Sequence, residues 1–168
     1  ETKIFYFNHI ILYAFDANQE ITYISTIPKY QKTSITIPKL GLSGGSANLS
    51  LGASFSFWNG SLTRQGFKYN SYIAYEHDGK IYIMYNDHRD NGDARTMEDV
   101  KVMSNKDKAN AVIVTVDSEG NWEKEAIFIG KDIDVILETS SSMAIPNQGF
   151  IISCERKKDV QYARIKIE

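Results

Sequence analysis

The 168-residue chain carries 19 Lys and Arg against 21 Asp and Glu, which gives a formal net charge of −2 at neutral pH. This balance provides no basic surface for nucleic acid, and no apolar run approaches the roughly 18 residues that a membrane-spanning helix needs. The length predicts a single domain, residues 1–168, with a core large enough to fold without a disulfide or a metal.

Four hairpins are predicted along the chain. In each, two segments rich in aromatic and β-branched residues flank a short turn that contains Asp, Asn or Gly. The segment pairs are 10–15 with 20–26, 72–75 with 81–85, 112–116 with 122–128, and 149–155 with 160–167. The Asp78-Gly79 turn of the second pair is the strongest of these signals, because both residues tolerate positive φ.

Two of the segments between these hairpins have a distinctive composition. Residues 42–66 are rich in Gly, Ser and Asn but include the aromatic run Phe55-Ser56-Phe57-Trp58, which predicts a loop with one short strand inside it. Residues 93–108 are charged, with only scattered apolar positions, and predict a long connection with at most one helical turn.

The apolar pattern differs between inner and outer strands. In 81–85 and 112–116 nearly every residue is apolar or aromatic, so both faces of these strands should be covered. In the last strand, Ala163, Ile165 and Ile167 alternate with charged residues, as in a strand with one face in water. This combination predicts an antiparallel all-β fold of about ten strands arranged as consecutive small sheets, with a two-sheet β-sandwich or barrel as the alternative.

Two short motifs each follow a predicted hairpin: Ile27-Pro28-Lys29-Tyr30-Gln31 and Tyr85-Asn86-Asp87-His88. They resemble motifs of an uncharacterised family of exported Bacteroidetes proteins with β-propeller-like repeats. The turns that begin at Asp16 and Asp117 also resemble the repeat turn of that family. The resemblance implies sheets arranged as part of a β-propeller, and export of the protein. It carries over no activity, substrate or catalytic residue.

Cys154 is the single cysteine, so an intramolecular disulfide is excluded. It follows the apolar residues Phe150, Ile151 and Ile152, which predicts a buried thiol. A chain without disulfides can still be exported. Because the sequence begins at Glu1 rather than Met and enters a predicted strand at once, we expect a processed or trimmed part of a longer protein, in the periplasm, at the cell surface or secreted.

Gly41-Leu42-Ser43-Gly44-Gly45 matches the Gly-x-Ser-x-Gly pattern of a hydrolase nucleophile. The residues that follow form a poor helix, and no His lies beyond position 88 to complete a triad in the required order. The histidines His9, His77 and His88 also lack the spacing of a zinc site. We therefore predict a flexible loop at 41–45 and no catalytic residues.

The stretch from Asp87 to Glu98 partly matches an EF-hand loop. Asp87, Asn91 and Glu98 stand at loop positions one, five and twelve, where Ca²⁺ finds oxygen ligands. Arg89, however, stands at position three, where a carboxylate or amide belongs, and the flanks do not have the pattern of helices. A Ca²⁺ site at these residues is therefore the less favoured prediction, and a solvated acidic loop the favoured one.

Trp58, Tyr69, Tyr72 and Tyr75 are the candidates for a binding surface, since exposed aromatic side chains stack on sugars and contact peptides. Aromatic residues at alternate strand positions more often belong to a core, and that interpretation is favoured for the set as a whole.

The predicted function is a non-catalytic binding or structural module of an exported protein, with a glycan or a protein as its ligand. The alternative is a hydrolase of glycan or peptide on a propeller-like scaffold, for which the sequence offers abundant carboxylates but no recognisable pair. A partial stack of sheets is also expected to self-associate or to pack against further repeats, because sheet faces and edges left uncovered are association sites.

Overall fold

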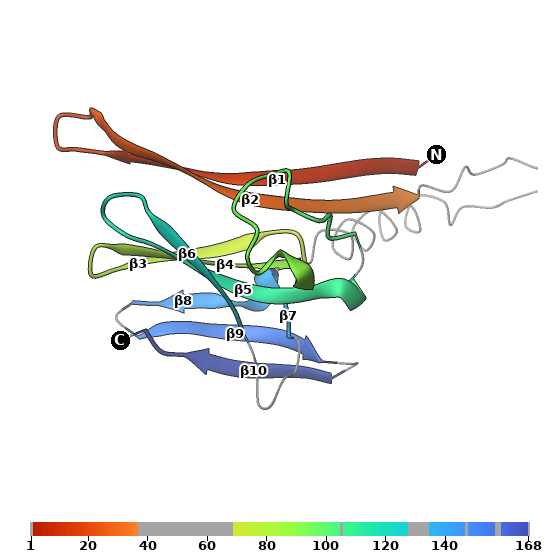
Figure 1. Ribbon diagram of the computed structural model, residues 1–168. Coiled ribbons are helices and arrows are strands. Elements are labelled where there is room, and N and C mark those ends of the chain that lie inside the picture. Colours follow the sequence, from red (N-terminus) through yellow and green to blue (C-terminus); the bar gives the residue numbers. More distant parts are fainter. Residues whose placement is uncertain are drawn as a thin grey trace, which may run out of the picture.

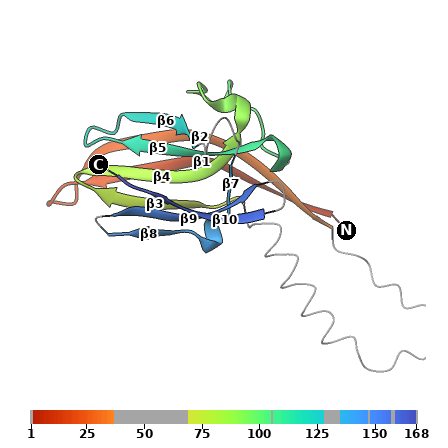
Figure 2. The same cartoon turned by 90° about the horizontal axis from the view of Figure 1, so that it is seen from below.

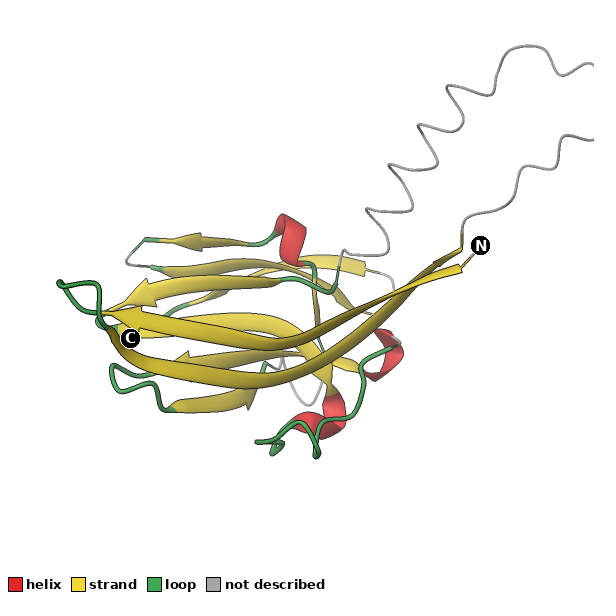
Figure 3. Ribbon diagram, turned by 90° about the horizontal axis from the view of Figure 1, so that it is seen from above, coloured by secondary structure: helices red, strands yellow, loops and turns green. Residues whose placement is uncertain are grey.

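The computed structural model describes residues 2–36, 69–104, 106–127, 135–146, 148–156 and 159–167, and most of them are in strands (Figure 3). The strands are β1 (Thr2–Phe15), β2 (Ile21–Thr36), β3 (Tyr72–His77), β4 (Lys80–His88), β5 (Ala109–Val116), β6 (Trp122–Ala126), β7 (Ile136–Leu137), β8 (Met143–Ile145), β9 (Gly149–Arg156) and β10 (Asp159–Ile165). Helix is confined, in these ranges, to the 3₁₀ turns η1 (Arg89–Asn91), η2 (Lys106–Lys108) and η3 (Thr139–Ser141). The predicted all-β class is confirmed. None of the helices in this part of the chain is long and apolar enough to cross a bilayer.

The strands form three antiparallel sheets that follow one another along the chain (Figure 1). The first is the hairpin β1–β2, and the central sheet has the order β3-β4-β5-β6. In the third, β9 lies between β10 on one edge and β7 and β8 on the other. The sheets stack face to face with the central sheet in the middle (Figure 2). Consecutive small sheets, not closed into one barrel, are what the sequence predicts.

Two hydrophobic clusters hold the stack together, one on each face of the central sheet. Because successive side chains of a strand point to opposite faces, Ile83 of β4 faces the hairpin while Met84 faces the third sheet. The hairpin-side cluster consists of Ile10, Ile27, Ile83, Tyr85, Val112, Val114 and Val116. The other cluster consists of Tyr82, Met84, Ala111, Leu137, Phe150 and Ile152. The prediction that β4 and β5 are covered on both faces is therefore confirmed.

Strand β10 has one covered and one exposed face, as its alternation predicts. Ala163 and Ile165, with Ile167 just beyond the strand, pack against the cluster on the third-sheet side. Val160 and Tyr162 are exposed on the opposite face. The apolar face of this strand thus finds its neighbour within the chain, in the central sheet.

The turns that begin at Asp16 and Asp117 have the same construction. Oδ1 of each Asp accepts hydrogen bonds from the backbone amides two and four residues further on. The residue three positions further on has a positive φ, 66° at Gln19 and 86° at Gly120. The likeness between the two turns in sequence is therefore also a likeness of structure.

The first hairpin is longer than predicted, with 14 residues in β1 and 16 in β2. The prediction ended the second strand at residue 26, whereas β2 continues through Pro28, a residue with no amide to donate to a neighbouring strand. The structure accommodates Pro28 in a β-bulge, where Pro28 and Lys29 of β2 lie opposite the single residue His9 of β1. His9 has a φ of 53°, which is uncommon for a residue with a side chain.

The connection between β4 and β5, predicted as a long charged loop, returns to the first hairpin. The Met103 amide donates to the Tyr30 carbonyl at 2.8 Å, and the Lys32 amide donates to the Met103 carbonyl at 2.9 Å. These bonds cover the edge of β2 that β1 does not occupy. The loop ends in the short 3₁₀ turn η2.

Candidate functional site

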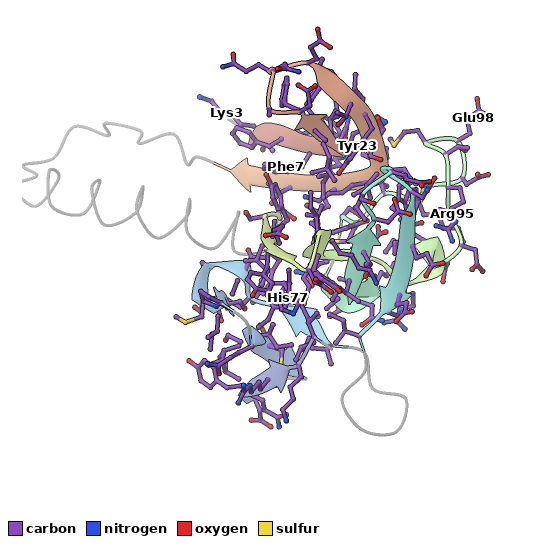
Figure 4. All side chains as sticks on the ribbon, turned by 90° about the vertical axis from the view of Figure 1, so that its left-hand side faces the viewer. Lys3, Phe7, Tyr23, His77, Arg95 and Glu98 are labelled. Carbon is purple, nitrogen blue, oxygen red and sulfur yellow. The ribbon has the colours of Figure 1, made fainter. Side chains whose placement is uncertain are left out.

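A pocket of about 540 Å³ lies between the first hairpin and the start of β3. Figure 4 shows Phe7, one of its lining residues, at this junction. The lining residues are Tyr6, Phe7, Asn8, His9, Ile10, Lys29, Asn70, Ser71 and Tyr72. The volume is in the range of small-molecule sites in proteins, roughly 300–1,000 Å³.

The bulge of the hairpin contributes to this pocket. His9 and Lys29, which belong to the two strands at the bulge, both line it. A bulge bends a strand and changes the direction of its side chains. A strained conformation such as that of His9 persists only where the surrounding structure enforces it, and such positions cluster at binding and active sites. The pocket therefore depends on a local irregularity of strand pairing.

Lys29 is a buried lysine in the pocket wall, 4% exposed. Its Nζ donates a hydrogen bond to the Asn70 carbonyl at 3.2 Å and lies 5.6 Å from the centroid of the Tyr85 ring. Burial lowers the pKa of Lys29 from 10.5 to about 8, and the charge of Asp87 opposes this shift without cancelling it. At neutral pH the amine is therefore a cation in a largely dry site.

Asp87, whose charge acts on Lys29, belongs to a different ion pair. Its carboxylate lies 3.2 Å from Nζ of Lys124, and both side chains are almost completely buried. It also accepts hydrogen bonds from the His88 amide at 2.8 Å and from Nδ2 of Asn91 at 2.7 Å. Lys29 has no comparable carboxylate of its own in the described structure, since none of the nine lining residues is Asp or Glu.

The calcium prediction concerned Asp87, Asn91 and Glu98. The structure brings Asp87 and Asn91 into direct contact, and Oδ1 of Asn91 accepts a hydrogen bond from the Lys101 amide at 2.8 Å. Glu98 is exposed on the loop, away from the sheets (Figure 4). Among the residues described, no three His, Cys, Asp or Glu side chains gather in a group that could hold a metal. The arrangement ties the loop to β4, and calcium binding stays a prediction.

The two motif segments, 27–31 and 85–88, contact each other. Nε2 of Gln31 donates to the Asn86 carbonyl at 2.5 Å. The Asn86 side chain donates to the Leu137 carbonyl and accepts from the Leu137 amide, both at 2.7 Å. Asn86 thus joins the central sheet to the hairpin through its backbone and to the third sheet through its side chain.

The structure describes three of the four predicted aromatic residues, and their surroundings differ. Tyr72 is half exposed and lines the pocket. The Tyr69 hydroxyl donates to a carboxylate on β9, and Tyr75 packs edge-on against Phe150 in the core. Trp58 lies outside the described residues, as does the Gly-x-Ser-x-Gly segment.

Sequence reasoning missed Lys29 and His9 as pocket residues. One signal for them was present: Pro28 interrupts an otherwise strand-like pattern, and proline inside a strand indicates a bulge. Nothing in the sequence shows, however, that the bulge faces the start of β3. That neighbourhood results from the stacking of two sheets.

No family model matches the sequence, and no match was found among curated proteins or among solved structures. The fold and the pocket define a class: an all-β module of three stacked antiparallel sheets with a pocket of small-molecule size where two sheets meet. Because a fold does not determine a function, the function has to be argued from the pocket.

Proposed function

We propose that this chain is a non-catalytic binding module of an exported protein, and that it binds a small ligand in the pocket between β1–β2 and β3. The observation that carries the proposal is the mixed lining of the pocket. Three aromatic side chains are combined with three amide or hydroxyl side chains: Tyr6, Phe7 and Tyr72 with Asn8, Asn70 and Ser71. Aromatic walls with a few polar groups are the usual lining of ligand sites. Export is supported by the resemblance of the two motif segments to those of exported proteins.

A sugar-like ligand, free or as part of a glycan, suits this lining. Its ring faces would stack on the aromatic side chains, and its hydroxyls would exchange hydrogen bonds with the amides. The alternative function, hydrolysis of a glycan or peptide, needs two carboxylates flanking the scissile bond. The nine lining residues provide none, so binding is the function that we propose.

A second role, assembly, is favoured by the outward face of the first hairpin. Tyr13 and Ile24 lie directly opposite each other in the pairing of β1 with β2, and they are 55% and 56% exposed. Ile11, two residues before Tyr13 on the same face, is 51% exposed. We propose that this apolar face packs on another sheet, which belongs to a second copy or to further repeats.

The binding function is tested by saturation-transfer NMR of the whole chain with a panel of neutral and acidic monosaccharides. Tyr72→Ala removes one aromatic wall of the pocket and should weaken binding by about tenfold. Tyr162→Ala is the matched control, because Tyr162 is an exposed tyrosine on β10, in another sheet. Absence of any binding to the unaltered protein, or an equal loss in both variants, would contradict the proposal.

A further inference from the structure

We infer that the ligand of this pocket carries a carboxylate and that Lys29 is the group that receives it. The inference rests on the proposed binding function and specifies its ligand: a small monoanion whose body is partly apolar and partly hydroxylated, as in a sugar acid.

The pocket differs in charge from the rest of the chain. The whole sequence has more Asp and Glu than Lys and Arg, 21 against 19. The nine lining residues include Lys29 and His9 but no acid. A concave site lined by one sign of charge concentrates ligands of the opposite sign. Lys29 supplies the charge among these nine residues, so this lining favours an anionic over a cationic ligand.

The Lys29 ammonium has hydrogen-bonding capacity to spare. It carries three N–H donors, and its one hydrogen bond within the described structure goes to the Asn70 carbonyl at 3.2 Å. Buried charges are normally paired and fully hydrogen-bonded, because leaving them unpaired is unfavourable. Lys29 and Asn70, which this hydrogen bond joins, both line the pocket. A carboxylate there would form a charge-assisted hydrogen bond with it.

The groups around Lys29 do not neutralise its charge. Those on neighbouring elements are Tyr85 and Asp87 on β4, Tyr6 and His9 on β1, and Tyr72 at the start of β3. Asp87 is the one carboxylate in this set, and Lys124 balances it at 3.2 Å. The positive charge of Lys29 is thus available to a ligand.

A single buried cation selects a monoanion. A carboxylate would leave the ion pair neutral, whereas a dianion such as sulfate would bring one uncompensated negative charge into a partly dry site whose electrostatics already include Asp87. The aromatic and amide side chains of the pocket would then contact the neutral body of the ligand.

The charge of Lys29 also determines how binding depends on pH. Burial lowers the pKa of the ligand-free amine to about 8. Above that value the amine loses its proton, so the affinity for a carboxylate should fall as the pH rises, by up to about tenfold per pH unit. A neutral ligand should show no such fall.

The test is an NMR titration of the whole chain with glucuronate, with its neutral isostere glucuronamide and with sulfate, a dianion at both pH values used, pH 7 and pH 9. We expect glucuronate to bind at least about tenfold more tightly than either of the others at pH 7, with a smaller advantage at pH 9. Lys29→Met should abolish the advantage. Lys80→Met, which removes an exposed lysine at the β3–β4 turn, should preserve it.

The outcomes separate this inference from the proposed function. Equal affinities for glucuronate and glucuronamide, both still weakened by Tyr72→Ala, would overturn the inference and leave the binding function standing. Sulfate that binds as tightly as glucuronate would also overturn it. No binding of either sugar would contradict the binding function as well. If Lys29→Met does not fold, the two sugars and the two pH values decide the matter with the unaltered protein.

Discussion

At the scale of single residues, Lys29 lowers the stability of the fold that holds it. Its pKa is about 8 in the folded chain against 10.5 ordinarily, so the unfolded chain binds the proton more tightly. The free energy of unfolding therefore rises with pH between about 8 and 10.5, and the destabilisation is fully present below about pH 8. A shift of this size corresponds to roughly 3 kcal/mol. A buried charge that lowers the free energy of unfolding by this amount is expected where the residue binds a ligand, because function and stability often oppose each other at such sites.

Lys29→Met should consequently stabilise the protein by about 2–3 kcal/mol at pH 7, because it removes the buried charge and keeps most of the side-chain volume. The difference between the two proteins should shrink as the pH approaches 10.5, where the ordinary lysine also loses its proton. Urea unfolding at several pH values measures the free energy of unfolding of both proteins. Subtracting one value from the other removes the contribution of all other titrating residues, because both proteins share them. A variant less stable than the parent at pH 7 would show that Lys29 serves the fold through Asn70.

At the scale of elements, Asp87 joins β4, β6 and the loop that follows β4. Its carboxylate pairs with Lys124 on β6 and accepts a hydrogen bond from Asn91 in η1. Lys124→Met should destabilise the protein by about 3–5 kcal/mol, because it leaves a buried carboxylate without its cation. Adding Asp87→Asn to this variant should recover part of the loss. Chemical unfolding of the single and double variants measures both effects. A Lys124→Met variant as stable as the parent would contradict the buried ion pair between Lys124 and Asp87.

The same variants bear on the calcium prediction. If Asp87 binds Ca²⁺, millimolar Ca²⁺ should raise the melting temperature of the unaltered protein, because a ligand selective for the native state stabilises it. The shift should disappear in Asp87→Ala. A shift of equal size in Asp87→Ala, or none in either protein, would remove the prediction.

The elements that could be predicted from the sequence are those that depend on local chemistry. Asp78 and Gly79 both adopt positive φ, 51° and 72°, as their residue types favour at a tight hairpin turn. The burial of both faces of β4 and β5 follows from their unbroken apolar runs. The extension of β2 beyond residue 26 was missed, because Pro28 is a strand-ending signal whose accommodation in a bulge depends on the register with β1.

The candidate site was harder to predict than the fold, and the reason is physical. Of the four aromatic residues proposed for a binding surface, Tyr72 lines the pocket. The burial of Lys29 depends on Tyr85 and Asn70, which come from other elements, and no local pattern reports such contacts. Asn86 was recognisable as a residue with hydrogen-bond partners, since an amide in a strand buried on both faces must be satisfied. The partners themselves lie on other sheets and could not be read from the sequence.

At the scale of the whole molecule, the stack of sheets ends in an exposed apolar face on each side. The hairpin side carries Ile11, Tyr13 and Ile24, each about half exposed. The third-sheet side carries Val160 and Tyr162, which are 51% and 71% exposed. Two different faces of this kind favour head-to-tail stacking, in which the hairpin of one copy packs on the third sheet of the next. Such contacts form rings if the rotation closes and open chains if it does not.

We therefore expect the protein to self-associate beyond a dimer as its concentration rises, which light scattering across a concentration series measures. Tyr13→Lys places a charge in the middle of the hairpin face and should shift the protein toward monomer, because burying that charge in a sheet-to-sheet contact is unfavourable. Ser118→Lys is the control, since it adds the same charge at the exposed β5–β6 turn and should leave association unchanged. A protein that stays monomeric at every concentration and binds no hydrophobic dye would contradict the proposed stacking of copies. Equal dissociation of both variants would attribute the effect to net charge and not to the hairpin face.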